Sequence, residues 1–456
     1  MPLLRTPSAP PSALPRASAR DEMRIAGQLI LPKILEGVIV RHRFGMAPSE
    51  RFQWDRRGID LVREMRERYG PGPLHLRAGG RSMALLLEQE DVARVLDGTP
   101  EPFTPATAEK RGALAKFQPH GSLITRGEKR EQRRRFNEDA LEMDKPLHHL
   151  APAVVRVVRE EAARLAEDAA AAGGVLDWDT FHQAWWRGVR RIVLGDDAAK
   201  DTGLTRGLDR LRAAANLSVF APRRKRLRAE FLVQLQRYAF SAGPQTLAGS
   251  LQQMHTDPDT DPVGQIPHWL FAFDAEAIVT LRALALLAGH PAEAGRAREE
   301  TGGADLDEPR ELPFLRGTVL ESVRLWPTTP MVLRESTEDT RWRGTVIPAG
   351  TGFAVYAPWF HRAEPAGAVA DRFVPDIWLD GRARENRGFV PFSGGPGRCP
   401  GENLVLFTAA TWLASLLDHR DFEPASTPRP EAGTPLPKTL NHFTLRCTVR
   451  DPARGS

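Results

Sequence analysis

The chain has 456 residues, of which 41% are hydrophobic and 27% charged, and its formal net charge at pH 7 is +5. This hydrophobic content excludes general intrinsic disorder, and so small a charge gives no support for nucleic acid as a partner. The cysteines are Cys399 and Cys447 alone. They exclude a disulfide framework and a zinc site built mainly from thiolates, and they favour a reducing, cytoplasmic compartment.

The domain organisation is inferred from the absence of repeats and of a long linker in the sequence. At about 150 residues per domain, three domains would fit, but no repeat and no long linker divides the chain, which favours a single domain over residues 21–456. Residues 1–20 hold five prolines and no acid. This pattern indicates a disordered tail, with a transit peptide as the alternative. The apolar stretch 25–40 is interrupted by Pro32, Lys33 and Glu36, so we expect no membrane anchor.

The predicted elements begin with a hairpin. Residues 73–87, with a Gly-Gly turn at 79–80, indicate two strands, and residues 88–96 have helical spacing. Apolar residues at three- and four-residue intervals then predict six helices, over residues 127–141, 151–172, 178–194, 204–217, 223–240 and 265–289. Further along we expect strands over 331–336, 340–348 and 352–358, an irregular stretch over 361–389, a helix over 401–417 and a last strand over 443–449. The sequence therefore predicts a mainly α fold with small β-sheets.

The helix over 265–289 is apolar on nearly every side, which predicts that it runs through the core. Its two acids, Asp274 and Glu276, are candidate catalytic residues because a buried acid must be paired or must have a role. An Asp274 that is bonded to backbone or to an arginine for structural reasons is the alternative. Glu276 lies two residues further round the helix, so we expect it to face away from Asp274.

The most informative segment is FSGGPGRCPG, residues 392–401, where one cysteine lies in a turn of four glycines and two prolines just before an apolar helix. Glycines let the backbone approach a bulky planar group. Amides at the start of a helix stabilise a thiolate, and a thiolate on haem iron promotes O–O cleavage. A buried, inert thiol is the alternative for Cys399.

This segment resembles the cysteine loop of the cytochrome P-450 superfamily, F-x-x-G-x-R/H-x-C-x-G. Phe392, Gly395, Cys399 and Gly401 match it in register, whereas Gly397 stands where the family has Arg or His. The resemblance implies haem b, with Cys399 as the ligand of the iron and with Phe392, Gly395 and Gly401 around the cofactor. It leaves the displaced Arg398 as the candidate contact to a haem propionate.

Upstream, Glu321-Ser-Val-Arg324 resembles the family's E-x-x-R helix, which implies a buried structural ion pair, and Arg334 on the following strand would reach a propionate. The family completes the ion network with an arginine, but here Ile377 occupies that place. Arg372 and His361 are the candidate substitutes.

Two further segments match the family in part. Arg130 and Arg134 lie one helical turn apart, where relatives hold a propionate, while Arg133 and Arg135 are expected to point elsewhere and to attract an acidic electron donor. In the central helix, Ala272 replaces a glycine of the family's A-G-x-D/E-T-T motif. Ala275 replaces its threonine, so the usual proton relay is incomplete at Asp274, Ala275 and Glu276.

By resemblance, the chain is of the soluble bacterial type and binds haem b between the central helix and the helix after Cys399. It would oxidise, by hydroxylation or epoxidation, a medium-sized organic substrate of secondary or lipid metabolism with O2. Electrons would come from NAD(P)H through a ferredoxin and its reductase, and the protein would be a monomer. A peroxide-driven enzyme, an enzyme that couples or rearranges its substrate, and a non-catalytic haem sensor or carrier are the alternatives. The pocket walls implied by the resemblance are residues 103–124, 216–222, 270–274, 328–332 and 440–443.

Overall fold

The structure is a computed structural model and describes residues 14–78, 80–216, 224–303 and 305–451. Residues 1–13 of the predicted tail lie outside the described residues. The chain is ordered before residue 21: Arg16 forms a β-bridge with His75, and the Ser18 hydroxyl accepts the Asp21 N–H at the start of the first helix. The tail prediction is therefore wrong for residues 14–20.

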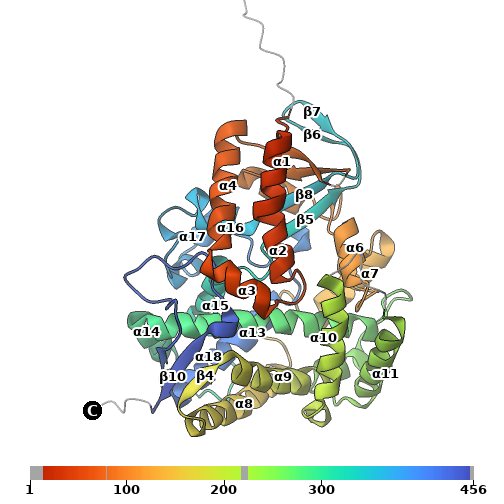
Figure 1. The fold of residues 1–456 in the computed structure, drawn as a ribbon. Helices are drawn as coiled ribbons and strands as arrows, with labels where there is room; N and C mark the ends of the chain where they lie inside the picture. Colours follow the sequence, from red (N-terminus) through yellow and green to blue (C-terminus); the bar gives the residue numbers. More distant parts are fainter. Residues whose placement is uncertain (1–13, 79, 217–223, 304, 452–456) are drawn as a thin grey trace, which may run out of the picture.

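A group of short helices that the sequence analysis did not predict forms the N-terminal part, at the top of Figure 1 in red and orange. They are α1 (Ala19–Ile25), the π-helical turn η1 (Ala26–Ile30), α2 (Leu31–Glu36), α3 (Arg43–Arg51) and α4 (Trp54–Tyr69). In the part of the chain that the structure describes, every helix is too short or too polar to cross a bilayer.

The main sheet contains the predicted hairpin, β1 (Leu74–Ala78) and β2 (Arg81–Leu85), and has the order β1-β2-β8-β5-β3. Its other strands are β8 (Gly352–Tyr356), which is parallel to β2, β5 (Met331–Ser336) and β3 (Phe103–Thr104). The predicted strand over 340–348 is a hairpin of β6 (Thr340–Trp342) and β7 (Thr345–Ile347). A third sheet joins β4 (Val175–Asp177), β10 (Arg446–Arg450) and β9 (Asp421–Pro424).

All six helices predicted between residues 126 and 300 are present, as are those predicted after the hairpin and after Cys399, although Leu217 and Arg223 lie outside the described residues. They are α5 (Gln89–Asp97), α7 (Glu128–Ala140), α8 (Ala151–Ala171), α9 (Trp178–Leu194), α10 (Thr202–Asn216), α11 (Lys225–Ser241), α13 (Ile266–Gly289) and α18 (Glu402–His419). Residues 217–222 of the expected pocket wall also lie outside the described residues.

The remaining helices are α15 (Pro313–Leu325), which carries the E-x-x-R motif, and several that were not predicted: α6 (Ala108–Leu114), α12 (Leu247–Ser250), α14 (Pro291–Thr301), α16 (Ala357–Arg362) and α17 (Arg382–Glu385). Single 3-10 turns complete the list: η2 (Ser122–Ile124), η3 (Asp196–Ala198), η4 (Leu251–Gln253), η5 (Val263–Gln265), η6 (Glu364–Val369), η7 (Pro375–Trp378), η8 (Gly395–Gly397) and η9 (His442–Thr444). The fold is mainly α with small sheets, as predicted.

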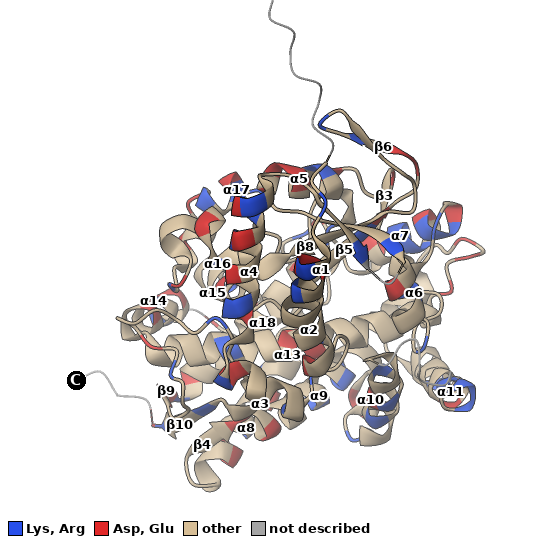
Figure 2. Cartoon of the chain, turned by 45° about the horizontal axis from the view of Figure 1, so that its top comes forward, with Lys and Arg blue, Asp and Glu red and all other residues tan. Residues whose placement is uncertain are grey.

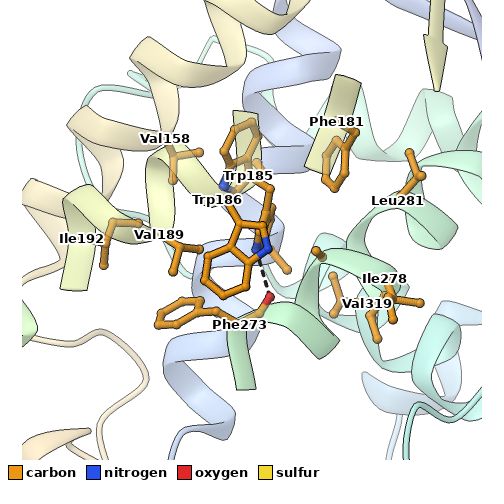
Figure 3. Close-up of a cluster of buried hydrophobic side chains, with 14 of the residues drawn as sticks. Val158, Phe181, Trp185, Trp186, Val189, Ile192, Phe273, Ile278, Leu281 and Val319 are labelled. Carbon is orange, nitrogen blue, oxygen red and sulfur yellow. Dashed lines mark hydrogen bonds between the residues drawn. The ribbon is translucent and has the colours of Figure 1, made fainter. Parts of the chain in front are cut away.

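Helix α13 crosses the middle of the molecule, with the main sheet above it and α8 and α9 below it (Figure 1). It packs against α9, α15 and α18, and every residue from 276 to 287 is buried. Figure 3 shows Trp185 of α9 beside Phe273 of α13, where the indole N–H donates to the Phe273 carbonyl oxygen over 2.9 Å. Trp185, Trp186, Trp269 and Trp359 are all buried in the core.

Charged residues of both signs are interspersed along the helices rather than gathered on one face (Figure 2).

Candidate functional site

The loop that carries Cys399 is held in shape by its own backbone. The Cys399 N–H donates to the Phe392 carbonyl oxygen over 3.0 Å, and the Gly401 N–H bonds the Cys399 sulfur. Gly395 has φ of +58°, and a Cβ there would lie 2.3 Å from the Leu96 carbonyl oxygen, so no other residue fits. The thiol therefore stands at a fixed position ahead of α18.

Burial raises the pKa of the Cys399 thiol to about 11, although the Gly401 N–H and the charge of Arg134 oppose this shift. A thiol with this pKa is neutral at pH 7. Binding to a metal ion deprotonates it, because the cation stabilises the thiolate.

Three arginines gather from α7 and β5. Arg130, Arg134 and Arg334 are all buried, and burial together with the charges of Arg130 and Arg134 lowers the pKa of Arg334 to about 10. The described residues supply this cluster with a single close carboxylate, Glu138, 2.5 Å from Arg134. The buried Nε of Arg130 has no hydrogen-bond partner in the described chain. Buried cations in excess of acids indicate a site for an anionic group.

Arg398 does not join this cluster, which corrects the sequence-based expectation. Its side chain is 43% exposed and lies 3.5 Å from Glu402. A Cβ at Gly397 would meet the Arg334 guanidinium at 2.9 Å. Arg334 therefore fills the space into which the family's side chain at this position would project.

The Glu321–Arg324 pair is fully buried, at 0% exposure for both side chains. Arg324 forms a two-pronged contact of 2.6 and 2.7 Å to the carboxylate, and its remaining donors reach the carbonyl oxygens of His361 and Arg372. Arg372 and His361 thus contribute main-chain acceptors, and neither side chain replaces the missing arginine.

Instead, the indole N–H of Trp378 donates to Glu321 over 2.9 Å, and so does the main-chain N–H of Val374. Trp378 directly follows the buried Ile377 that stands in the arginine's place. Sequence reasoning missed this residue because a tryptophan beside an unmatched position carries no motif.

On α13, the residues ahead of the fully buried stretch form a partly exposed stripe. His268, Phe271, Ala272 and Ala275 lie at i, i+3, i+4 and i+7 and therefore share a face. Burial and the charge of Arg134 lower the pKa of His268 to about 4. The charge of the same arginine also acts on Cys399, so His268 and the cysteine loop both lie near Arg134. His268 was not predicted as a site residue.

Asp274 is turned toward the helices beneath α13. Its carboxylate forms an ion pair with the fully buried Arg212 of α10 and lies 3.2 Å from the His182 ring of α9. Burial would raise the pKa of Asp274, but the charge of Arg212 and the bond to His182 outweigh it and hold the pKa well below its usual range. Asp274 is therefore a fixed anion, as in the structural alternative.

Glu276 faces a different neighbour. It is buried, and its carboxyl lies near the backbone of Ala409 on α18. Neither carboxyl oxygen has a hydrogen-bond partner within the described residues, and burial raises its pKa well above the usual value. Burial thus favours the protonated form of Glu276, which faces away from Asp274, as predicted.

Of the two arginines expected on a solvated face, only one is there. Arg135 is 66% exposed and lies 3.7 Å from Asp257. Arg133 is buried and donates to the Asp259 carbonyl oxygen and the Thr125 hydroxyl. Arg133 is therefore structural, and its assignment to the docking surface is wrong.

Comparisons with known proteins agree with this geometry. The family model for cytochrome P450 matches residues 272–443. This range includes Ala272 and Ala275 of the α13 stripe, the E-x-x-R pair and the cysteine loop. Over these residues the chain is similar to the cytochrome P-450 superfamily. It also has the superfamily's fold: a retinoic acid bound cyanobacterial CYP120A1 superposes with a TM-score of 0.69 at 18% identity, over 86% of this chain and 94% of that one.

Among curated relatives, cytochrome P-450 714C3 of Oryza sativa subsp. japonica is 32% identical over 163 residues, 33% of this chain and 32% of that protein. Cytochrome P-450 734A5 of the same plant is 28% identical over 77% of this chain and 74% of its own length. Cyclooctat-9-en-7-ol 5-monooxygenase of Streptomyces melanosporofaciens is 31% identical over 29% of this chain and 30% of its own length. In the first relatives matched, the similar region spans only about a third of the relative's own length.

The residues present fit the haem of a cytochrome P-450. Cys399 offers a sulfur ligand in a loop that only glycine can close at residue 395. The orphaned Nε of Arg130 and the acid-poor cluster around Arg334 fit the two propionates of haem b.

Proposed function

We propose that this protein is a haem-thiolate monooxygenase, built as one domain, that hydroxylates or epoxidises a medium-sized organic substrate. The observation that carries the proposal is the pairing of a fixed, half-buried Cys399 with an acid-poor cluster of buried arginines. When bound, the haem supplies the activation of O2, one atom of which enters the substrate while the other leaves as water.

In this proposal the chain's own residues have separate tasks. Cys399 ligates the iron, with the Gly401 N–H on its sulfur to stabilise the thiolate. Arg130, Arg134 and Arg334 hold the propionates. Ala272 and Ala275, which are small and partly exposed, would leave space beside α13 for O2 and substrate.

Proton delivery would differ from that of relatives with the family's acid–threonine motif. Ala275 has no hydroxyl, and Glu276 faces α18, so neither completes a relay. We infer that Asp274, fixed by Arg212, orders water beside α13, or that a hydroxyl or carboxylate of the substrate supplies the missing bond.

The substrate and partner proposals rest on similarity and surface chemistry. A relative named for a cyclooctatenol and a structural neighbour bound to retinoic acid support a partly apolar substrate of secondary or lipid metabolism. Electrons would come from NAD(P)H through a ferredoxin and its reductase. The exposed Arg398, next to Cys399, would attract such an acidic donor.

The test is a comparison of oxidants on one substrate. We expect turnover with NADPH, ferredoxin and reductase, and one atom of labelled O2 in the product. Equal turnover with hydrogen peroxide alone would favour a peroxide-driven enzyme, and product without label would favour coupling or rearrangement. A protein that binds ligands at the haem yet never consumes NADPH with them would be a sensor or carrier.

A further inference from the structure

A partly buried cation, Lys110, lies next to the arginine cluster. Lys110 of α6 donates from Nζ to the Leu333 carbonyl oxygen of β5 over 3.1 Å. The same oxygen accepts a hydrogen bond from Arg334 Nη1 over 3.0 Å. An ammonium and a guanidinium therefore meet at one uncharged acceptor.

No acid of the described residues lies within ion-pair distance of either cation. The remaining donors of Arg334 reach two hydroxyls, on Thr99 and Ser393. Glu335, the next residue of β5, is bonded to Arg81 and Arg126. Burial, reinforced by the charge of Arg334, lowers the pKa of Lys110 to about 7. A buried and a partly buried cation side by side are unfavourable unless an anion joins them.

The position of Lys110 and Arg334 indicates which kind of anion they would bind. Arg334 links Lys110 to the cysteine loop: its Nη1 shares the Leu333 carbonyl oxygen with Lys110, and its Nη2 lies 2.9 Å from where a Cβ at Gly397 would stand. Lys110 also lies on α6, within the pocket wall expected over residues 103–124. A planar, charged acceptor that bonds both a lysine and an arginine is a carboxylate.

We propose that Lys110 and Arg334 together bind a carboxylate at the junction of α6 and β5. This inference rests on the proposed function, because the two sources of the carboxylate are a haem propionate and an acidic group on the substrate. Lys110 thereby replaces the cation that Gly397 lacks.

The test uses the holoprotein with Lys110→Met and Lys110→Arg, and Lys129→Met as the control. Lys129 is 60% exposed, is paired with Asp259 and lies outside the cluster. Two quantities are measured for each variant: the rate of haem transfer to apomyoglobin, and the Soret shift on titration with dodecanoic acid and with dodecan-1-ol. The thermal melting curve checks that each variant folds.

If the carboxylate is a propionate, Lys110→Met speeds haem loss by at least about ten-fold, as expected for a lost charge-assisted hydrogen bond. If it belongs to the substrate, haem loss is unchanged and the preference for acid over alcohol falls by a similar factor. In either case Lys110→Arg keeps most of the wild-type haem retention or acid preference, and Lys129→Met changes neither.

Unchanged haem loss together with an unchanged acid preference in Lys110→Met overturns the inference. The proposed function fails separately, through a wild-type protein that shows no thiolate-type haem spectrum.

Discussion

Replacing Trp378 by phenylalanine removes an indole N–H that donates to the Glu321 carboxylate over 2.9 Å. That carboxylate is 0% exposed, so water cannot take the place of the lost donor. A hydrogen bond to a buried charged group contributes about 1.5–3 kcal/mol. We therefore expect the free energy of unfolding to fall by about 2 kcal/mol or more. Urea denaturation of the holoprotein, followed by far-UV circular dichroism, measures the change.

Trp326→Phe is the matched control, because its indole N–H donates to the uncharged Pro437 carbonyl oxygen over the same 2.9 Å. Trp326 is more deeply buried than Trp378, so its loss of packing is at least as large. If the charge of the acceptor matters, Trp378→Phe lowers the free energy of unfolding by as much as the control or more. A cost below about 1 kcal/mol, and smaller than that of the control, would refute the assignment of Trp378 as the substitute for the missing arginine.

Three predictions concern the acids and the alanine of α13. Asp274→Asn removes one of the two carboxylates paired with the buried Arg212 and leaves it only the partly exposed Asp209; the change should cost about 2 kcal/mol at pH 7. Because the folded state depresses the pKa of Asp274, the difference from wild type in urea melts should shrink as the pH falls below about 4; a pH-independent difference would contradict the ion pair. Glu276→Gln should match wild type at pH 4 and become the more stable protein as the pH rises, since burial disfavours the ionised form of Glu276; a variant less stable at pH 8 would argue that the carboxylate is charged. Ala275→Thr should change the fraction of electrons lost to peroxide by about two-fold or more, and an unchanged ratio of product to NADPH would count against a relay that lacks a hydroxyl.

The helices between residues 126 and 300 could be predicted because each buries one face, and the resulting three- and four-residue spacing is visible in the sequence. The short N-terminal helices α1, α2 and α3 could not. They include a π-helical turn and expose several apolar residues, so no regular spacing marks them. The start of the folded chain was missed for a related reason, because Arg16 joins the structure through a single β-bridge.

Within the site, residues fixed by the family's motif could be predicted, and the replacements for missing ones could not. Cys399, Glu321 and Arg324 lie in the expected arrangement. The residue that compensates for Ile377, Trp378, comes from an unmatched position. Arg334 was predicted as a propionate contact, but its place against Gly397 was not, because only the packing of distant segments brings the two together. The sequence likewise located Asp274 but not its partners on α9 and α10, because pairing between helices leaves no signal in one chain.

The central claim, that Cys399 holds the haem iron through its thiolate, is tested most directly by the spectrum of the reduced protein with carbon monoxide. The wild type should show the red-shifted Soret band of a thiolate ligand, and Cys399→Ala should lose it. Cys447→Ala is the control, since this second thiol is buried on β10 and its removal should leave the band unchanged. A Cys399→Ala protein that keeps the thiolate-type band would contradict the account.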